Sequence, residues 1–169
     1  MNPFHVLLLG NIGHDPMPKM MRRAMSEIAT RLNDLACTIV VGRGTQLATT
    51  LLRSRLPAAE YNVEQVSGML DGSLHAVPIR AIILFAYGHE QTIARCIPWV
   101  QRALAGSEHD VPFVLVTTEW LNAEAMIRRF FPEGEPPGWF KHVRVAGVEL
   151  DRAAISRVTC HVTQQTAVI

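Results

Sequence analysis

Hydrophobic and polar positions alternate in blocks along this chain. Four apolar runs, at residues 5–10, 37–42, 80–88 and 112–118, each end in a short polar loop, and three of these loops open with glycine. Stretches with helical spacing separate the runs. Continuous apolar runs are typical of strands that are buried on both faces of a parallel sheet. The pattern predicts an α/β fold, a three-layer Rossmann-like sandwich whose central, mostly parallel sheet has about five strands.

Four stretches between or after these runs have the pattern of helices. Residues 17–32 carry an apolar stripe at helical spacing, and residues 45–55 begin at Thr45, a favourable N-cap residue. Residues 119–131 form the third predicted helix. A fourth is expected over residues 91–104, where an internal proline would kink or divide it.

The remaining segments are shorter or less regular. Residues 61–66 are consistent with a short strand, residues 133–138 form a loop rich in proline and glycine, and residues 141–147 alternate as a fifth strand. We expect one Rossmann-like domain over residues 1–169. Within it, residues 148–169 form either a C-terminal strand, centred on 158–163, or an arm that docks on a second copy in a homo-oligomer.

Composition excludes several classes of function. Hydrophobic residues make up 49% of the chain and charged residues 18%, which is typical of a globular protein with an ample core. The formal net charge of +1 gives no global attraction for nucleic acid, and the pairs Arg22-Arg23 and Arg128-Arg129 are interpreted as solvated helix faces. No apolar run approaches the roughly 18 residues that span a bilayer. With no signal-peptide pattern at the start, we expect a cytoplasmic protein that binds neither membrane nor nucleic acid.

The cysteine and histidine positions give no sign of a metal site. Three cysteines lie far apart, without the close spacing of a metal or redox motif, and the histidines do not group at metal-ligand spacings. We therefore expect no metal, and no cofactor follows from these residues.

The polar loops after the apolar runs indicate where chemistry would take place. In parallel α/β sheets, ligands bind outside the carboxyl ends of the strands. The strongest loop has Gly42 and Gly44 on either side of Arg43, directly before a predicted helix. Small residues there let backbone approach a phosphate, and Arg43 and Thr45 add donors. The alternative is a tight strand-to-helix turn, with Arg43 pointing into water.

Two further loops supply candidate groups for a sugar or for acid/base chemistry. In residues 10–15, asparagine and aspartate are suited to ribose hydroxyls, or they are only turn residues ahead of the helix. Glu90 and Glu119 are the candidate catalytic acids, although each also suits the first turn of a helix as a dipole partner. The candidate ligand-binding residues are Gly10, Asn11, Gly13, Asp15, Gly42, Arg43, Gly44, Thr45, Gly88, His89, Thr92 and Thr117.

Two of these segments resemble a known family. Residues 40–44 and 87–92 are similar to the glycine loops of the Rossmannoid nucleotide-binding group that contains lysine-decarboxylase-like cytokinin phosphoribohydrolases and SLOG sensor domains. Here His89 and Gln91 stand where that group has glycines, and Arg95 stands where its glutamate would be. The resemblance implies a binding or sensing member more readily than a hydrolase.

Three functions follow as hypotheses. The first is a domain that binds or senses a nucleotide or nucleotide-derived small molecule at the carboxyl ends of the strands. The second is a ribosyl-bond hydrolase or transferase on the same rim, because a carboxylate stabilises an oxocarbenium-like transition state. The third is a protein-interaction subunit without a ligand. It would use an aromatic set that could equally cap the core, namely Trp120, Phe130, Phe131, Trp139 and Phe140.

Overall fold

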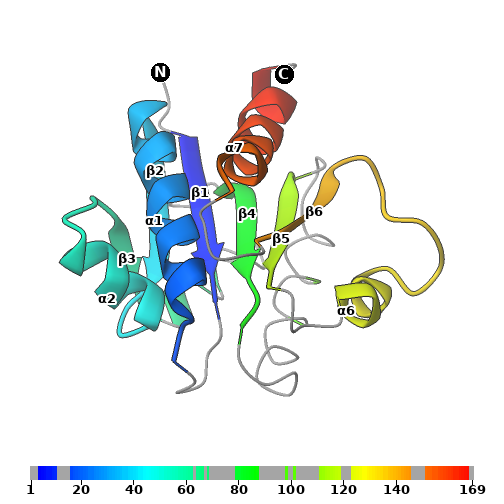
Figure 1. Ribbon diagram of the computed structural model, residues 1–169, viewed down its shortest axis with the longest axis horizontal. Coiled ribbons are helices and arrows are strands. Elements are labelled where there is room, and N and C mark those ends of the chain that lie inside the picture. The colour runs from blue at the N-terminus through cyan, green and yellow to red at the C-terminus, as the bar shows by residue number, and fades with distance from the viewer. Residues whose placement is uncertain are drawn as a thin grey trace.

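The computed structural model describes residues 4–10, 16–62, 64–66, 68, 79–87, 98, 101, 111–118, 123–145 and 151–167. They contain one six-stranded sheet in which every neighbouring pair of strands is parallel (Figure 1). The strands are β1 (Phe4–Leu9), β2 (Cys37–Gly42), β3 (Ala59–Tyr61), β4 (Ile79–Phe85), β5 (Phe113–Thr117) and β6 (Phe140–Arg144). The described residues also form the helices α1 (Lys19–Asp34), α2 (Gln46–Arg53), α6 (Ala123–Phe130) and α7 (Arg152–Ala167). The predicted parallel α/β sandwich is confirmed, with six strands in place of about five.

The strand order is β3-β2-β1-β4-β5-β6. The chain therefore builds outward from β1 in one direction and then, starting with β4, in the other. This is the strand order of the Rossmann fold, and the place where the order reverses, between β1 and β4, is its topological switch point. Ligands of such folds bind at the carboxyl side of that point.

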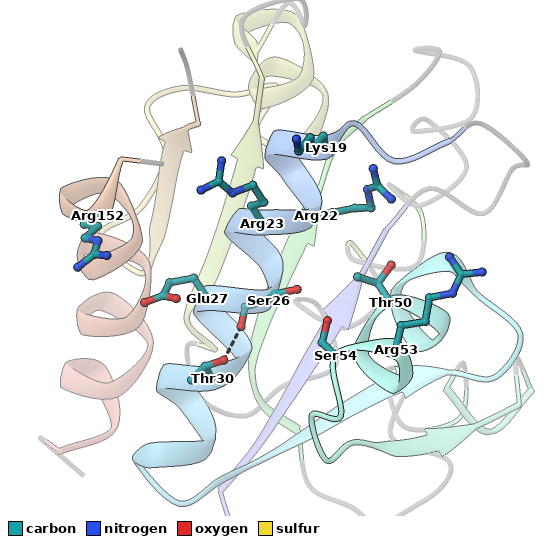
Figure 2. Close-up of a pocket in the computed structure, with 10 residues that line it drawn as sticks. All are labelled: Lys19, Arg22, Arg23, Ser26, Glu27, Thr30, Thr50, Arg53, Ser54 and Arg152. Atoms are coloured by element: carbon teal, nitrogen blue, oxygen red, sulfur yellow. Dashed lines mark hydrogen bonds between the residues drawn. The ribbon is translucent and has the colours of Figure 1, made fainter. Parts of the chain in front are cut away.

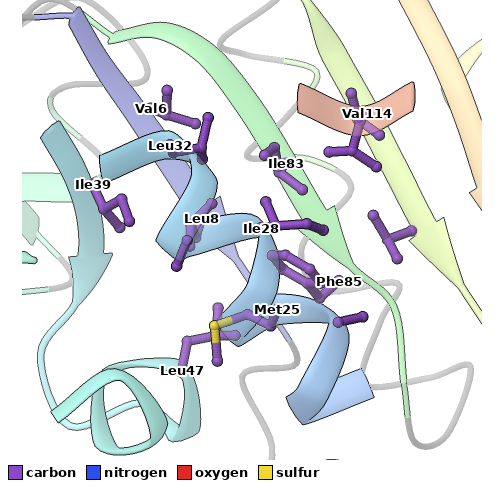
Figure 3. Packing of buried hydrophobic residues seen from close by; sticks show 14 of the residues in the cluster. Val6, Leu8, Met25, Ile28, Leu32, Ile39, Leu47, Ile83, Phe85 and Val114 are labelled. Carbon is purple, nitrogen blue, oxygen red and sulfur yellow. The ribbon is translucent and has the colours of Figure 1, made fainter. Parts of the chain in front are cut away.

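Alternate residues of each central strand supply two separate core layers, because successive side chains point to opposite faces of a sheet. On one face, Val6 and Leu8 of β1 pack with residues of α1, α2 and α7. Figure 3 shows Met25 and Ile28 of α1 beside Leu8 on this face. On the other face, Leu7 belongs to a second cluster to which α6 contributes. Burial on both faces explains why the central strands are continuous apolar runs in the sequence.

The predicted helix over residues 17–32 is confirmed as α1. Its apolar stripe, including Met21 and Met25, is fully buried against the sheet. The pairs Arg22-Arg23 and Arg128-Arg129 are exposed, as expected of solvated helix faces. None of the described helices is both long enough and apolar enough to cross a membrane.

The prediction of a C-terminal strand at residues 158–163 is wrong, because these residues belong to helix α7. Asp151 begins the helix by accepting hydrogen bonds from the backbone N–H groups of Ala153 and Ala154, both at 3.1 Å. Val158 and Val162, four residues apart, are buried in the chain's own core. Arg31 of α1 donates a hydrogen bond of 2.7 Å to the hydroxyl of Ser156. The segment thus packs as a helix on its own chain.

The strand predicted at 61–66 ends at Tyr61. Asn62 and Gln65 exchange hydrogen bonds, since the Gln65 backbone N–H donates to Asn62 Oδ1 at 2.7 Å and the Asn62 N–H donates to Gln65 Oε1 at 3.0 Å. This reciprocal pair caps the start of a helical segment at residues 64–66 and stops the strand. The helix predicted at 91–104 lies outside the described residues, apart from residues 98 and 101.

Aromatic side chains between β5 and β6 form an internal cluster. The ring of Phe113 lies 5.2 Å from that of Phe130 and 5.5 Å from that of Phe140. Phe131 contacts Phe140 and Trp139 edge-on, at 5.0 and 5.5 Å. The interpretation that these residues cap the core is therefore confirmed, while Trp120 lies outside the described residues.

Candidate functional site

The carboxyl ends of β1, β2, β4 and β5 meet at one edge of the sheet, as the parallel topology requires. Gly10 follows β1 at the switch point. A Cβ atom at this position would lie 3.0 Å from Leu47 Cδ1 and 3.4 Å from Tyr87 Cε1. Both of those side chains are almost fully buried. Gly10 therefore lets the start of α2 and the end of β4 close over β1, a packing role that the sequence did not reveal.

The turn between β2 and α2 is held by hydrogen bonds within the chain. The Thr45 hydroxyl donates to the Gly42 carbonyl at 2.7 Å and accepts from the Ala48 backbone N–H at 3.3 Å, which confirms Thr45 as the N-cap of α2. The Arg43 backbone N–H donates to the Tyr61 carbonyl at 2.7 Å. Two of the polar groups predicted to face a phosphate thus already have partners in the chain.

What the turn offers to solvent is the Arg43 side chain and the space above Gly44. Both residues are exposed. Gly44 has φ +76°, a conformation that L side chains rarely adopt, and a Cβ atom there would meet nothing within 4 Å. The turn therefore requires glycine at this position, and it is also an open surface beside a charged donor.

Gln46, the first residue of α2, joins this turn to the segment before α1. Its side-chain oxygen accepts a hydrogen bond of 2.9 Å from the backbone N–H of Met17. The segment leading into α1 is thus fixed beside the start of α2. The local sequence gives no sign of this contact, because the partner of Gln46 is 29 residues away.

Thr117, a predicted ligand-binding residue, is fully buried at the end of β5. Its hydroxyl lies 2.7 Å from Nε2 of His142 on β6. Burial of the imidazole, reinforced by the nearby charge of Arg144, lowers the pKa of His142 below its ordinary value of 6.5. The lowered pKa favours the neutral form of the imidazole that the Thr117 hydroxyl contacts, and this pair joins two strands in a way that no sequence motif indicates.

This pair predicts a pH-dependent stability. Since the folded protein protonates His142 only below the unfolded value of 6.5, its stabilising contribution is present above that pH and is lost as the pH falls through the folded pKa. In His142→Gln, the melting temperature should fall less than in the parent between about pH 8 and about pH 5. Arg144→Gln removes only the smaller cause of the lowered His142 pKa. It should therefore reduce the fall in melting temperature by less than His142→Gln does. Parallel losses in parent and His142→Gln would contradict this assignment.

The other candidates lie outside the described residues: Asn11, Gly13, Asp15, Gly88, His89, Glu90, Thr92 and Glu119. Both candidate catalytic acids are in this group, so no described contact bears on the hydrolase hypothesis. Of the candidate set, the structure describes Gly10, Gly42, Arg43, Gly44, Thr45 and Thr117.

The fold and this edge define the chain as a parallel α/β protein with Rossmann strand order and an open, arginine-bearing turn after its second strand. No protein family model matches the chain. No curated protein sequence matches it either. The resemblance to the SLOG and phosphoribohydrolase group therefore stays a prediction that depends on two loops.

Proposed function

We propose that the carboxyl edge of the sheet binds a nucleotide or nucleotide-derived small molecule, with the Arg43 guanidinium as a phosphate contact. The observation that carries this proposal is the Rossmann strand order, which puts its switch point between β1 and β4. Nucleotides bind at the switch point in proteins of this architecture. β2 pairs with β1, so the turn after β2 lies at the same edge of the sheet as the end of β1.

The character of Arg43 supports a phosphorylated ligand. Its side chain is exposed, and among the residues that the structure describes it forms no ion pair. A guanidinium presents a planar fork of N–H donors that matches two phosphate oxygens. In dinucleotide-binding Rossmann domains, an acidic residue beyond the first loop binds ribose hydroxyls, whereas an arginine there accommodates a phosphate on the ribose. Arg43 therefore favours a ligand that carries a phosphate group at this position.

The proposal predicts a large loss of affinity in Arg43→Ala. A charge-assisted hydrogen bond contributes about 1.5–3 kcal/mol, and 1.4 kcal/mol is a factor of ten, so binding should weaken about 10- to 150-fold. Isothermal titration calorimetry of the full chain against NAD, NADP, ADP-ribose, AMP and cyclic dinucleotides measures this.

A matched control is Arg80→Ala. Arg80 is also an exposed arginine, but it lies near the start of β4 and hence at the opposite edge of the sheet. Its replacement should leave nucleotide affinity unchanged while removing the same charge. The proposal fails if no ligand of the panel binds to the parent. It also fails if both Arg43→Ala and Arg80→Ala bind the parent's ligand with the parent's affinity.

A further inference from the structure

A groove lined by positive charge runs along α1, flanked by residues of α2 and by Arg152 of α7, and its smaller hollow begins at Gln46, next to the turn that carries Arg43. It consists of two adjoining hollows of about 600 and about 320 Å³, which share Arg22, Thr50 and Arg53. Figure 2 shows Arg22 extending from α1 toward α2, and Arg53 extending from α2 on the same side. Lys19, Arg23 and Arg152 add three more cations to the larger hollow.

Negative charge does not balance these cations. Among the described lining residues the acidic one is Glu27, and it already pairs with Arg31, with 3.4 Å between Glu27 Oε1 and Arg31 Nε. In the part of the chain that the structure describes, no carboxylate pairs with any of the five lining cations. The groove thus concentrates positive charge on a chain whose formal net charge is only +1.

The position of three of these cations on α1 adds to their mutual repulsion. Lys19, Arg22 and Arg23 lie in the first turns of the helix, which has no acidic residue in its first turn and no side-chain cap at Pro18. A helix N-terminus carries partial positive charge, so cations there are unfavourable and an anion is favourable. A bound anion would therefore relieve a repulsion that the free protein holds.

Hydroxyl groups stand between the arginines. In Figure 2, Thr50 and Ser54 of α2 lie between Arg53 and helix α1. Arginines that alternate with hydroxyls are a typical donor set for phosphate oxygens, which accept several short hydrogen bonds at once. None of the described residues that line either hollow is aromatic, so this part of the groove offers charge and hydrogen bonds but no ring on which a base could stack.

We propose that this groove binds a compact molecule with two or more phosphate groups, at a site lined by α1 and α2 and not by the turn that carries Arg43. The larger hollow has a volume of about 600 Å³, which is that of a small-molecule site of about 300–1,000 Å³. Single-stranded nucleic acid is disfavoured, because its binding depends on stacking platforms and the described lining holds no aromatic residue. Neither Arg43 nor Gly44 lines the groove, so this site does not depend on the nucleotide proposal.

Inorganic tripolyphosphate is the probe, titrated calorimetrically into the full chain at fixed salt. The parent should bind tripolyphosphate, and its melting temperature should rise when the probe is present. The double variant R22Q/R53Q should bind it about 10-fold or more weakly, because it loses both shared arginines. The control R128Q/R129Q removes the same charge from exposed positions on α6, a helix that packs on the opposite face of the sheet. This control should bind like the parent.

Three results would overturn the proposal. Equal loss in R128Q/R129Q would mean that only net charge matters. Orthophosphate binding as tightly as tripolyphosphate would remove the need for several phosphates. Tighter binding of a single-stranded oligonucleotide would identify a nucleic-acid surface instead. Because Arg22 and Arg53 are exposed, the unliganded melting temperature of R22Q/R53Q should equal that of the parent, which separates lost binding from lost folding.

Discussion

Val158→Asp should unfold the protein or bring it close to unfolding. Val158 lies on the face of α7 that packs on the sheet, and it is 1% exposed. A carboxylate there would be buried without a partner, at a cost of about 4 kcal/mol or more. That is a large share of the roughly 5–15 kcal/mol by which such domains are stable. Urea unfolding followed by circular dichroism measures the change in the free energy of unfolding.

The neighbouring residue provides the control. Arg157 is exposed on the same helix, so Arg157→Asp should change the free energy of unfolding by no more than about 0.5 kcal/mol. Ile155→Ala, which opens a cavity at a buried position without adding charge, should cost about 2–5 kcal/mol. If Val158→Asp unfolds at the parent's urea midpoint, α7 does not pack on the sheet.

Phe113→Ala should be the most destabilising truncation in the aromatic cluster. Phe113 is fully buried and its ring contacts those of Phe130 and Phe140. Removing a buried phenyl group costs about 3–5 kcal/mol through lost burial and the cavity left behind. The urea midpoint of the variant, compared with that of Phe131→Ala at a half-buried position, measures this cost.

A double-mutant cycle tests whether the rings act together. Phe113→Leu and Phe140→Leu keep much of the apolar volume and remove the stacked ring pair, for which the coupling energy should be about 0.5–1.5 kcal/mol. If the losses in free energy of unfolding of the two single variants simply add in the double variant, the stacked rings have no coupling energy. A smaller loss in Phe113→Ala than in Phe131→Ala would place the centre of the cluster elsewhere.

The sequence predicted elements correctly where a strand is buried on both faces or where a local rule applies. Strands β1, β2, β4 and β5 are buried on both faces, and this makes them apolar runs that are visible without the structure. Thr45 was predicted as an N-cap because its oxygen needs only an N–H group three residues ahead.

The predictions failed where the same apolar spacing fits both a strand and a helix, or where contacting residues are far apart in sequence. Val158 and Val162 are an even number of residues apart, so they fit one face of a strand as well as one face of a helix. The contact between Thr117 and His142 depends on the pairing of β5 with β6. The groove depends on α1 and α2, whose arginines come together only after the chain has passed through β2.

The position of β1 in the sheet has a consequence for the order in which the protein is synthesised. β1 pairs with β2 on one side and with β4 on the other, yet β4 begins only at Ile79. At about 5–20 residues per second, a ribosome needs several seconds to reach it. During that interval one hydrogen-bonding edge of β1, an apolar strand, lacks its partner β4. Open strand edges template association with other chains. The nascent chain is therefore most exposed to association through this edge before β4 has been synthesised.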